Sequence, residues 1–271
     1  MKIKKLTLDN IDIGQVTLPE QFTEQIRPDL IKRAVLAIQA NKRQAYGSDV
    51  DSGMKHSSYI SRRRRKYRGS YGLGIARVPR KIHSRSGTRM NWTAAGVPNV
   101  VGGRPGHPPQ INKVWEQKIN QTEKRMAIRS AIAATIVNDT VKSRGHRIPK
   151  GYPFIIEDKA EDLKSTKAIV IVLNKLGLTE ELDRVSEAKE RPGKGKMRGR
   201  RFRKKSGPLL VVSKSCPLSK GARNIPGVEI AIVDKLNTEM LAPGTVPGRL
   251  TIWTEGAIQR LEKEKLFCKR K

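Results

Sequence analysis

A run of five consecutive cations, Arg62–Lys66, is the most distinctive local feature of the sequence. Tyr59, Tyr67 and Tyr71 interleave with this run and its basic neighbours. Arginine can bridge two phosphates and stack on an exposed base, so this mixture of residue types suits contact with nucleic acid. An isolated run of this kind is more often a solvated charge cluster or a nuclear localisation signal. The surrounding sequence must decide between these alternatives.

That surrounding segment has no acidic residue from Ser52 to Trp115, while Lys55–Arg104 contains thirteen Lys and Arg. A surface that serves only solubility mixes both signs of charge, and this one does not. Glycines in the same segment allow the backbone to approach a partner closely. The setting therefore favours a binding role for Arg62–Lys66.

The whole chain repeats this imbalance, with 56 Lys and Arg against 25 Asp and Glu and a net charge of +31 over 271 residues. A small domain ordinarily carries a net charge of about 2 to 8 in magnitude. So large an excess favours a polyanionic partner, because each phosphate that is neutralised releases condensed counterions. An anionic membrane is less suitable, since the apolar run Ala168–Leu173 is far shorter than the roughly 20 residues that a spanning helix needs.

Aromatic side chains make up only 4% of the chain. Proteins that read single-stranded bases usually present a platform of exposed Phe, Tyr and Trp. The composition therefore favours recognition of nucleic-acid shape and backbone charge, with little reading of bases.

Motifs of phosphate-handling enzymes are incomplete in this chain. The segment from Gly72 to Gly74 lacks the third glycine of a dinucleotide-binding loop. Gly195-Lys196 is followed by Met197, where a phosphate-binding loop needs Ser or Thr. Neither motif supports a nucleotide-binding enzyme.

Metal sites are also poorly supported. His56, His83 and His107 lie in the basic segment without Cys or carboxylate neighbours at metal-ligand spacing, and they suit RNA contacts or turns better. A further group of acids near the end of an expected strand could mimic a two-metal site, although pairing with lysines or a solvated helix start explains it more simply. These acids are Glu157, Asp158, Glu161 and Asp162.

The two cysteines, Cys216 and Cys268, match no metal or redox spacing, which is typical of inert thiols in a reducing compartment. The N-terminal segment lacks the apolar stretch of a secretory signal. We therefore expect a cytoplasmic protein.

The expected elements divide the chain into three segments. Residues 1–43 are predicted to be ordered, with strands at Ile3–Leu8 and Gln15–Leu18 and a helix from Pro28 to Lys42. Residues 44–110 contain ten Gly and five Pro without a sustained period of 2 or 3.6, which predicts an extended basic loop. Residues 111–271 are predicted to complete a globular α/β domain.

The third segment opens with a predicted helix from Asn120 to Val137, in which Asn120 and Glu123 can form a capping box. The helix is apolar nearly all round, which is typical of a buried element. Arg125 and Arg129, four residues apart, would share one of its faces.

Four short apolar runs then alternate with helical segments. Runs of this kind are typical of strands buried on both faces of a parallel sheet. We predict a layered α/β domain in which helices flank a mainly parallel four-stranded sheet, with every strand of the sheet after Tyr152. The predicted strands are Pro153–Ile156, Leu209–Ser213, Val228–Val233 and Leu250–Trp253, and the helices include Leu178–Ala188 and Thr254–Leu266, whose Ala257, Ile258 and Leu261 face inward.

Two further segments are a β-branched run of ambiguous structure and a second basic stretch. Ala168–Leu173 is β-branched enough for a strand, but Gly177 stands where a helix C-terminal glycine would, so we predict a helix over Ser165–Leu176. Lys189–Lys205 contains ten Lys and Arg and one Glu, and it is a second candidate for a basic loop that faces RNA.

Six stretches, spread over nearly the whole chain, carry a resemblance to a known family. In order along the chain they are Arg27–Gly47, Gly74–Arg80, Val101–Pro109, Glu123–Thr135, Gly193–Arg203 and Leu241–Ile258. In these stretches the sequence resembles the large-subunit ribosomal protein L-four family in its archaeal and eukaryotic branch. The short segment after the last stretch is similar to archaeal members, and Arg62–Lys66 is more basic than is usual for the family's loop.

The resemblance implies a non-enzymatic structural protein that supports assembly of the large ribosomal subunit. It implies a globular domain on the outside of the subunit and a loop that threads into the large-subunit ribosomal RNA and helps to line the nascent-peptide exit tunnel. The implied partners are this RNA, neighbouring large-subunit proteins and the nascent peptide near the loop tip, with no membrane and no small-molecule substrate. We expect no intrinsic cofactor and no protein metal site, and Mg²⁺ only as an RNA-bound counterion.

The residues expected to contact RNA are mainly cations and aromatics of the long loop, with two arginines of the buried helix and cations of the second basic stretch. They are Arg43, Tyr46, Lys55, His56, Arg62, Arg63, Arg64, Arg65, Lys66, Tyr67, Arg68, Tyr71, Arg77, Arg80, Lys81, His83, Arg85, Arg89, Trp92, Arg104, His107, Arg125, Arg129, Lys194, Lys196, Arg198, Arg200, Arg201 and Arg203. Candidates for the vicinity of the tunnel are Arg68, Tyr71, Gly72, Gly74 and Arg77.

Two other classes of function stay open at this point. A phosphate-handling α/β enzyme with basic surface loops would bind a small cofactor or turn over a nucleotide. A chromatin protein or general RNA-binding protein would purify with DNA or with mixed RNA. The nucleic acid that copurifies with the chain, measured with its salt dependence, discriminates among the three.

Overall fold

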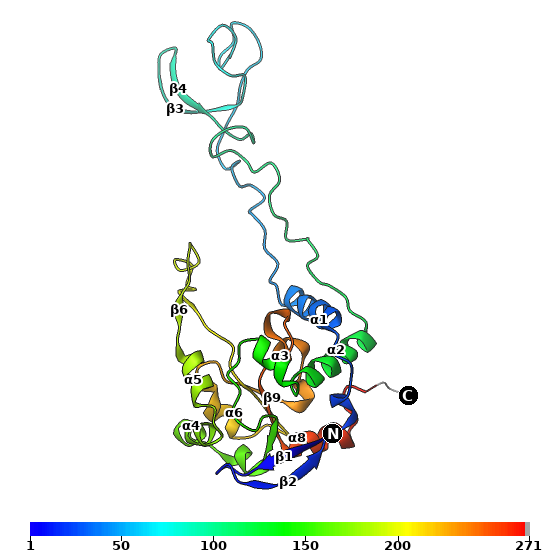
Figure 1. Cartoon of the computed structure of the whole chain (residues 1–271). Helices are drawn as coiled ribbons and strands as arrows, with labels where there is room; N and C mark the ends of the chain where they lie inside the picture. The colour runs from blue at the N-terminus through cyan, green and yellow to red at the C-terminus, as the bar shows by residue number, and fades with distance from the viewer. Residues whose placement is uncertain (269–271) are drawn as a thin grey trace. The chain divides into compact units, whose positions relative to one another are not determined.

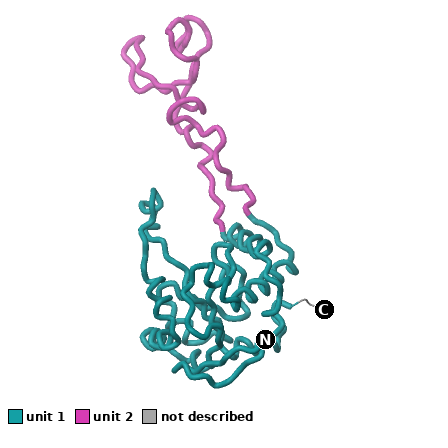
Figure 2. Tube along the Cα trace, viewed as in Figure 1, with its two compact units in different colours: residues 1–42, 116–271 teal, residues 43–115 magenta. Residues whose placement is uncertain are grey.

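The computed structural model describes residues 1–268, and the chain divides into two compact units (Figures 1 and 2). The globular unit consists of residues 1–42 together with the chain from residue 116 onward. The inserted unit consists of residues 43–115. Within the described residues, no helix has the length and apolar character needed to cross a membrane.

A six-stranded sheet with the order β2-β1-β5-β10-β8-β9 forms the centre of the globular unit. Five of the strands are parallel, and β2 pairs antiparallel with β1 at one edge. The strands are β1 (Lys2–Leu6), β2 (Asp12–Thr17), β5 (Phe154–Ile156), β8 (Leu209–Val212), β9 (Glu229–Ile232) and β10 (Thr251–Thr254).

The central strands β5, β8 and β10 are buried along their whole length. Because successive side chains of a strand point to opposite faces, they enter two separate hydrophobic clusters. Leu209 joins one cluster together with Trp253, whereas Leu210 joins the other together with Ile252. The prediction of strands buried on both faces is thus confirmed for these three, whereas β9, at the edge of the sheet, buries only Ala231.

Helices cover both faces of the sheet (Figure 1). Ile31, Ile132 and Ile258 bring three helices into the cluster on one face, and Ile169 and Leu218 bring two helices into the cluster on the other. The first three are α1 (Pro28–Asn41), α2 (Gln121–Ala134) and α8 (Glu255–Lys263), and the other two are α4 (Thr166–Lys175) and α6 (Leu218–Gly221). The remaining α-helices are α3 (Asn138–Ser143), α5 (Thr179–Ser186) and α7 (Thr238–Leu241).

The ambiguous segment is helical, as α4 confirms, but the predicted number of strands is wrong. Strand β1 lies inside the sheet, where Lys4 is opposite Phe154 and Leu6 is opposite Ile156. Of its residues only Ile3 is buried, so β1 lacks the continuous apolar run that marked the other parallel strands. For that reason its sequence predicts a strand without revealing its place in the sheet.

The predicted capping box of α2 is also wrong. Asn120 precedes the helix, but its side chain makes no cap hydrogen bond. Glu123 instead pairs with Arg33 of α1, with 3.2 Å between Nη1 and Oε1. Helix α2 ends at Ala134, and Val137 is extended and precedes α3.

A buried charge network joins the segment after α3 to α5. His146 Nδ1 lies 2.6 Å from Glu181 Oε1, and Arg184 donates to both carboxylate oxygens at 2.7 and 2.8 Å. Burial raises the pKa of Glu181, but hydrogen bonds from Arg184, His146 and the Arg147 amide outweigh this effect and lower it to about 2. Burial lowers the pKa of His146 against the opposing effect of Glu181, so we assign a neutral imidazole that donates from Nδ1.

Candidate nucleic-acid interface

An antiparallel hairpin, β3 (Arg80–Ser86) and β4 (Arg89–Ala94), is the regular part of the inserted unit. The turn has two residues, and Gly87 at its first position has φ +59°, a conformation that favours glycine. The prediction of an irregular loop over residues 44–110 missed this hairpin. Each strand is short, and on β4 the less exposed positions are Met90, Trp92 and Ala94, which alternate with polar residues.

The basic run lies in a segment that is attached to the hairpin. Tyr59 and Arg80 exchange backbone hydrogen bonds at 3.1 and 3.4 Å, and the amide of Ser61 donates to the carbonyl of Arg68 at 2.8 Å. These contacts close a small loop whose residues Arg62–Lys66 are exposed. Arg65 and Arg68 have positive φ values of 56° and 55°, which cost roughly 1–2 kcal/mol each in a residue other than glycine.

Cations and aromatic rings pair repeatedly within the inserted unit. The guanidinium carbons of Arg77 and Arg85 lie 4.6 and 4.9 Å from the ring centroids of Tyr71 and Tyr67. A guanidinium over a ring is held flat, and its outer N–H groups stay available to an acceptor. The exposed arginines are in this way partly ordered before any partner binds.

The charge of the inserted unit is almost unopposed. It has 15 Lys and Arg against two acids, Asp49 and Asp51. Among these cations, all of which the structure describes, only Lys55 forms an ion pair, with Asp49. Such a surface repels itself unless a polyanion neutralises it.

The histidines of the inserted unit have different surroundings. His83 lies 2.8 Å from the hydroxyl of Thr93 across the hairpin, and His107 is exposed. His56 is partly buried, and its Nε2 has no hydrogen-bond partner among the described residues. No group of three or more His, Cys, Asp or Glu within the described part of the chain is arranged to hold a metal ion.

A second basic hairpin, β6 (Lys189–Glu190) and β7 (Phe202–Arg203), belongs to the globular unit. Arg201 pairs with Glu190 at 2.8 Å, and Lys205 pairs with Glu187 at 3.1 Å. The intervening Lys194, Lys196, Arg198 and Arg200 form no ion pair with a described residue. The hairpin therefore presents a compact group of free cations.

Arg125 and Arg129 lie elsewhere, on α2 of the globular unit. The side chain of Arg129 is only 10% exposed, pairs with Glu24 at 2.7 Å and donates to the carbonyl of Phe267 at 2.8 Å. Arg125 donates to the carbonyl of Cys268 at 3.3 Å. These contacts within the protein give both arginines a structural role, and the RNA contact expected of them stays a prediction.

The acids that could mimic a metal site also have a structural role. Glu161 accepts hydrogen bonds from the Ser213 amide at 2.8 Å, the Ser213 hydroxyl at 2.7 Å and the Thr254 hydroxyl at 2.7 Å. Asp158 accepts from the amide of Gly256 at 2.6 Å. These carboxylates fasten the ends of β8 and β10 and the start of α8.

Sequence reasoning missed Lys113 and Trp115 at the end of the inserted unit. The ring of Trp115 stacks on that of Tyr46, with 5.7 Å between centroids, and Lys113 Nζ lies 4.3 Å from the Trp115 centroid. Two signals in the sequence could have identified them. Lys113 lies two residues before Trp115, and Trp115 lies outside every predicted apolar run. Met90 was missed as well, because the hairpin was missed.

Comparison with known proteins identifies the family. The model of the ribosomal protein L4/L1 family matches residues 16–264. The protein named "Large ribosomal subunit protein uL4" of Nanoarchaeum equitans is 48% identical over 268 residues, which cover 98% of this chain and all of the relative. Proteins of the same name from Methanococcoides burtonii and Archaeoglobus fulgidus are 45% and 42% identical, over 92% and 96% of this chain and 93% and 98% of their own lengths. The chain therefore belongs to the ribosomal protein L4/L1 family.

Proposed function

We propose that this chain is a structural protein of the large ribosomal subunit and that its inserted unit penetrates folded ribosomal RNA. Membership of the family supports the ribosomal role, and the family is a structural, non-enzymatic class. One observation carries the rest: a compact unit of residues 43–115 with a net charge of +13 and a single internal ion pair. Folding alone leaves this charge uncompensated, and RNA phosphates would compensate it.

Recognition by backbone charge and RNA shape fits the contacts of this unit. Arg62–Lys66 is exposed on a loop held by the hairpin, where its side chains can reach phosphates of neighbouring RNA helices. Lys194, Lys196, Arg198 and Arg200 form a second contact point on the globular unit.

The proposal extends to the nascent-peptide exit tunnel. Residues Arg68–Arg77 would approach the tunnel wall, where the nascent peptide passes. Gly72 and Gly74 have φ values of +78° and +65°, and a Cβ at either position would meet no atom within 4 Å. Backbone of this kind can follow a narrow wall closely, which supports the expected position.

As a ribosomal constituent the protein works in the cytoplasm, with neighbouring large-subunit proteins among its partners. We propose that it has no enzymatic activity of its own, no small-molecule substrate and no membrane partner. Mg²⁺ would reach it only as a counterion of the RNA.

Isolation of the affinity-tagged chain from its own cells, followed by sedimentation and sequencing of the bound nucleic acid, tests the proposal. We expect the chain to sediment with large subunits and to bring down large-subunit ribosomal RNA. A variant with Arg62→Ala and Arg64→Ala should dissociate at lower salt than the wild type. A matched variant of exposed lysines of the globular unit, Lys150→Ala with Lys167→Ala, should not.

Recovery of DNA or of mixed RNA would contradict the proposal and favour a general nucleic-acid-binding protein. A bound nucleotide that is turned over would favour an enzyme. Equal salt resistance of the two variants would show that the inserted unit is not the main contact.

A further inference from the structure

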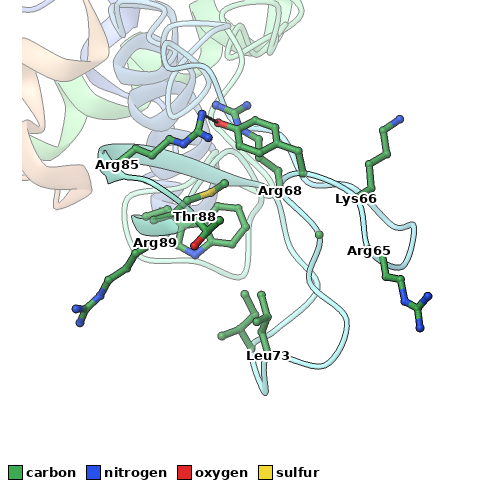
Figure 3. Close-up of a pocket in the computed structure, with 12 residues that line it drawn as sticks. Arg65, Lys66, Arg68, Leu73, Arg85, Thr88 and Arg89 are labelled. Atoms are coloured by element: carbon green, nitrogen blue, oxygen red, sulfur yellow. Dashed lines mark hydrogen bonds between the residues drawn. The ribbon is translucent and has the colours of Figure 1, made fainter.

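A pocket of about 560 Å³ lies within the inserted unit, between the loop of the basic run and the hairpin (Figure 3). Its walls include Tyr67, Leu73, Met90 and Trp92, and five cations surround these apolar groups. Ligand pockets for single small molecules have volumes of roughly 300–1,000 Å³, so this cavity has the size for one nucleotide-sized group.

A β-bulge in β3 determines which side chains of the hairpin line this pocket. Ile82 lies opposite Trp92, but His83 is an extra residue, and Arg85 then lies opposite Met90. Without the extra residue Ser84 would face Met90, and Arg85 would point to the other side of the hairpin. The bulge therefore places a guanidinium on the same face as Met90 and Trp92.

Tyr67 lies on the wall of the pocket opposite this face of the hairpin. Arg85 reaches across the pocket, where Nη1 lies 3.4 Å from the Tyr67 hydroxyl and the guanidinium carbon lies 4.9 Å from the ring centroid (Figure 3). The ring of Tyr67 is half exposed. Nε of Arg68, another lining residue, is buried and has no hydrogen-bond partner among the described residues. A donor without an acceptor is thus available beside an exposed aromatic ring.

The side chains of the other three lining cations point away from the pocket. Figure 3 shows the side chains of Arg65, Lys66 and Arg89 extending outward from the pocket. An apolar and aromatic interior with cations that point outward matches the two parts of a nucleotide, a flat base and charged phosphates on either side of it.

We propose that this pocket binds one unpaired, unstacked nucleotide of an RNA. Its base would lie against Trp92 and Met90, near the donors of Arg68 and Arg85, and the adjacent phosphates would meet Arg65, Lys66 and Arg89. The inference rests on the proposed function, because it takes RNA as the partner of the inserted unit. It adds recognition of a single extruded base to contacts that otherwise read only charge and shape.

The hydrogen-bond donors of the lining decide among possible occupants. An apolar side chain of a peptide would fill the interior but would leave the buried Nε of Arg68 without an acceptor. A paired RNA helix keeps its bases stacked and has no flat surface to insert, whereas a bulge or loop presents one at low cost. The low aromatic content of the chain is no objection, because the proposal needs two rings at one place.

Binding of two short RNA hairpins to the full-length chain tests the inference. One hairpin carries a single unpaired 2-aminopurine in its stem, and the other is fully paired. We expect the bulged hairpin to bind about tenfold more tightly, as stacking of one base predicts. The 2-aminopurine fluorescence should fall on binding, because the base stacks on an aromatic ring.

Trp92→Ala should abolish this preference, so that the two hairpins bind with similar affinity. Because Trp92 also packs within the hairpin, Tyr67→Ala on the opposite wall is a second variant, and we expect it to weaken the preference. A matched control, Arg62→Ala with Arg64→Ala, changes cations outside the pocket and should weaken binding of both hairpins equally.

Equal affinity of the wild type for the two hairpins, with strong salt dependence, would overturn the pocket inference and leave the proposed function standing. A preference that survives both Trp92→Ala and Tyr67→Ala would also overturn it. Failure of the wild type to bind either hairpin would overturn the proposed function together with the inference.

Discussion

The guanidinium carbon of Arg43 lies 3.6 Å from the ring centroid of Trp115, and these two residues are the first and last of the inserted unit. Tyr46 stacks on Trp115, with 5.7 Å between the ring centroids, and the guanidinium carbon of Arg43 lies 5.2 Å from the Tyr46 centroid. Further along, the amide of Ser48 donates to the carbonyl of Pro109 at 3.2 Å. The two ends of the insertion are therefore held together by specific contacts.

Trp115→Ala should loosen this closure. A cation–π contact contributes about 0.5–2 kcal/mol, so amide hydrogen exchange should accelerate several-fold in residues 44–50 and 108–114. The globular unit should keep its melting temperature. Val114→Ala, at a neighbouring exposed side chain, is the matched control and should change neither quantity. Exchange rates that stay the same in Trp115→Ala would show that the ring does not hold the ends.

Salt should weaken binding of the chain to large-subunit ribosomal RNA steeply. If about 8 phosphates are neutralised, the logarithm of the affinity should fall against the logarithm of the salt concentration with a slope of roughly −5 to −7. Filter binding or fluorescence anisotropy over a range of KCl concentrations gives this slope. A slope near zero would contradict the electrostatic account.

Acid should destabilise the globular unit through Glu181. Its folded pKa of about 2 lies below the roughly 4.3 of an unfolded Glu, so it contributes stability above pH 4.3 that is lost as the pH falls towards 2. The lowered pKa of His146 acts in the same direction, since the unfolded chain takes up a proton first, below about pH 6.5. Urea unfolding should show a steady loss of stability from pH 6.5 downward.

Glu181→Gln should lower the free energy of unfolding by about 3 kcal/mol at pH 7, because Arg184 loses its buried partner. The difference in the free energy of unfolding between this variant and the wild type should narrow between pH 5 and pH 3, because the wild-type carboxylate then contributes less stability. Glu180→Gln, on the exposed side of the same helix, is the matched control. A difference that does not depend on pH would show that the charge of Glu181 is not the cause.

Glu161→Ala should destabilise the globular unit by about 2–4 kcal/mol, because it leaves the Ser213 amide and two hydroxyls without an acceptor. Asp162→Ala changes an exposed neighbour and should stay within about 0.5 kcal/mol of the wild type. Urea denaturation measures both. Equal effects of the two substitutions would contradict the structural role of Glu161.

The sequence predicted elements best where burial is uniform. Strand β8 and helix α1 were located within about two residues, because a continuous apolar run and an apolar helical stripe each have one explanation. Strand β1 shows the limit, since its apolar residues Ile3 and Leu6 lie among lysines and do not reveal that β5 pairs with it inside the sheet. The prediction of a capping box was wrong because Arg33 of another helix pairs with the carboxylate of Glu123.

The candidate site was predictable in composition but not in geometry. Charge alone indicated that Arg62–Lys66 contacts a polyanion, and this contact stays a prediction. The position of Arg85 could not be predicted, because it depends on one extra residue, His83, which interrupts the alternation of side chains along β3. The pairing of Arg43 with Trp115 joins residues far apart in sequence, which no local pattern reveals.

Removal of Lys55–Arg104, with a short flexible linker between the ends, should leave the globular unit folded and able to bind the outer surface of the subunit. A Cβ on Gly53 would lie 2.4 Å from the backbone of Gly103, so the two ends are already adjacent and a short linker spans them. The deletion removes thirteen cations but no residue of either large hydrophobic cluster. Circular dichroism and thermal melting should therefore show cooperative unfolding close to that of the full chain.

The same deletion should impair the interior of the subunit. RNA segments that the thirteen cations neutralise would repel one another, so assembly should require more Mg²⁺, and nascent chains should meet a wider tunnel where the loop is missing. Incorporation into subunits at graded Mg²⁺ concentrations measures the first effect, and crosslinking of arrested nascent chains measures the second. A control that keeps the loop but replaces Arg62–Lys66 with Gln should raise the Mg²⁺ requirement without widening the tunnel, because its backbone is still present. Loss of cooperative unfolding in the deletion would mean that the loop belongs to the core, whereas unchanged assembly and crosslinking would mean that its charge has another purpose.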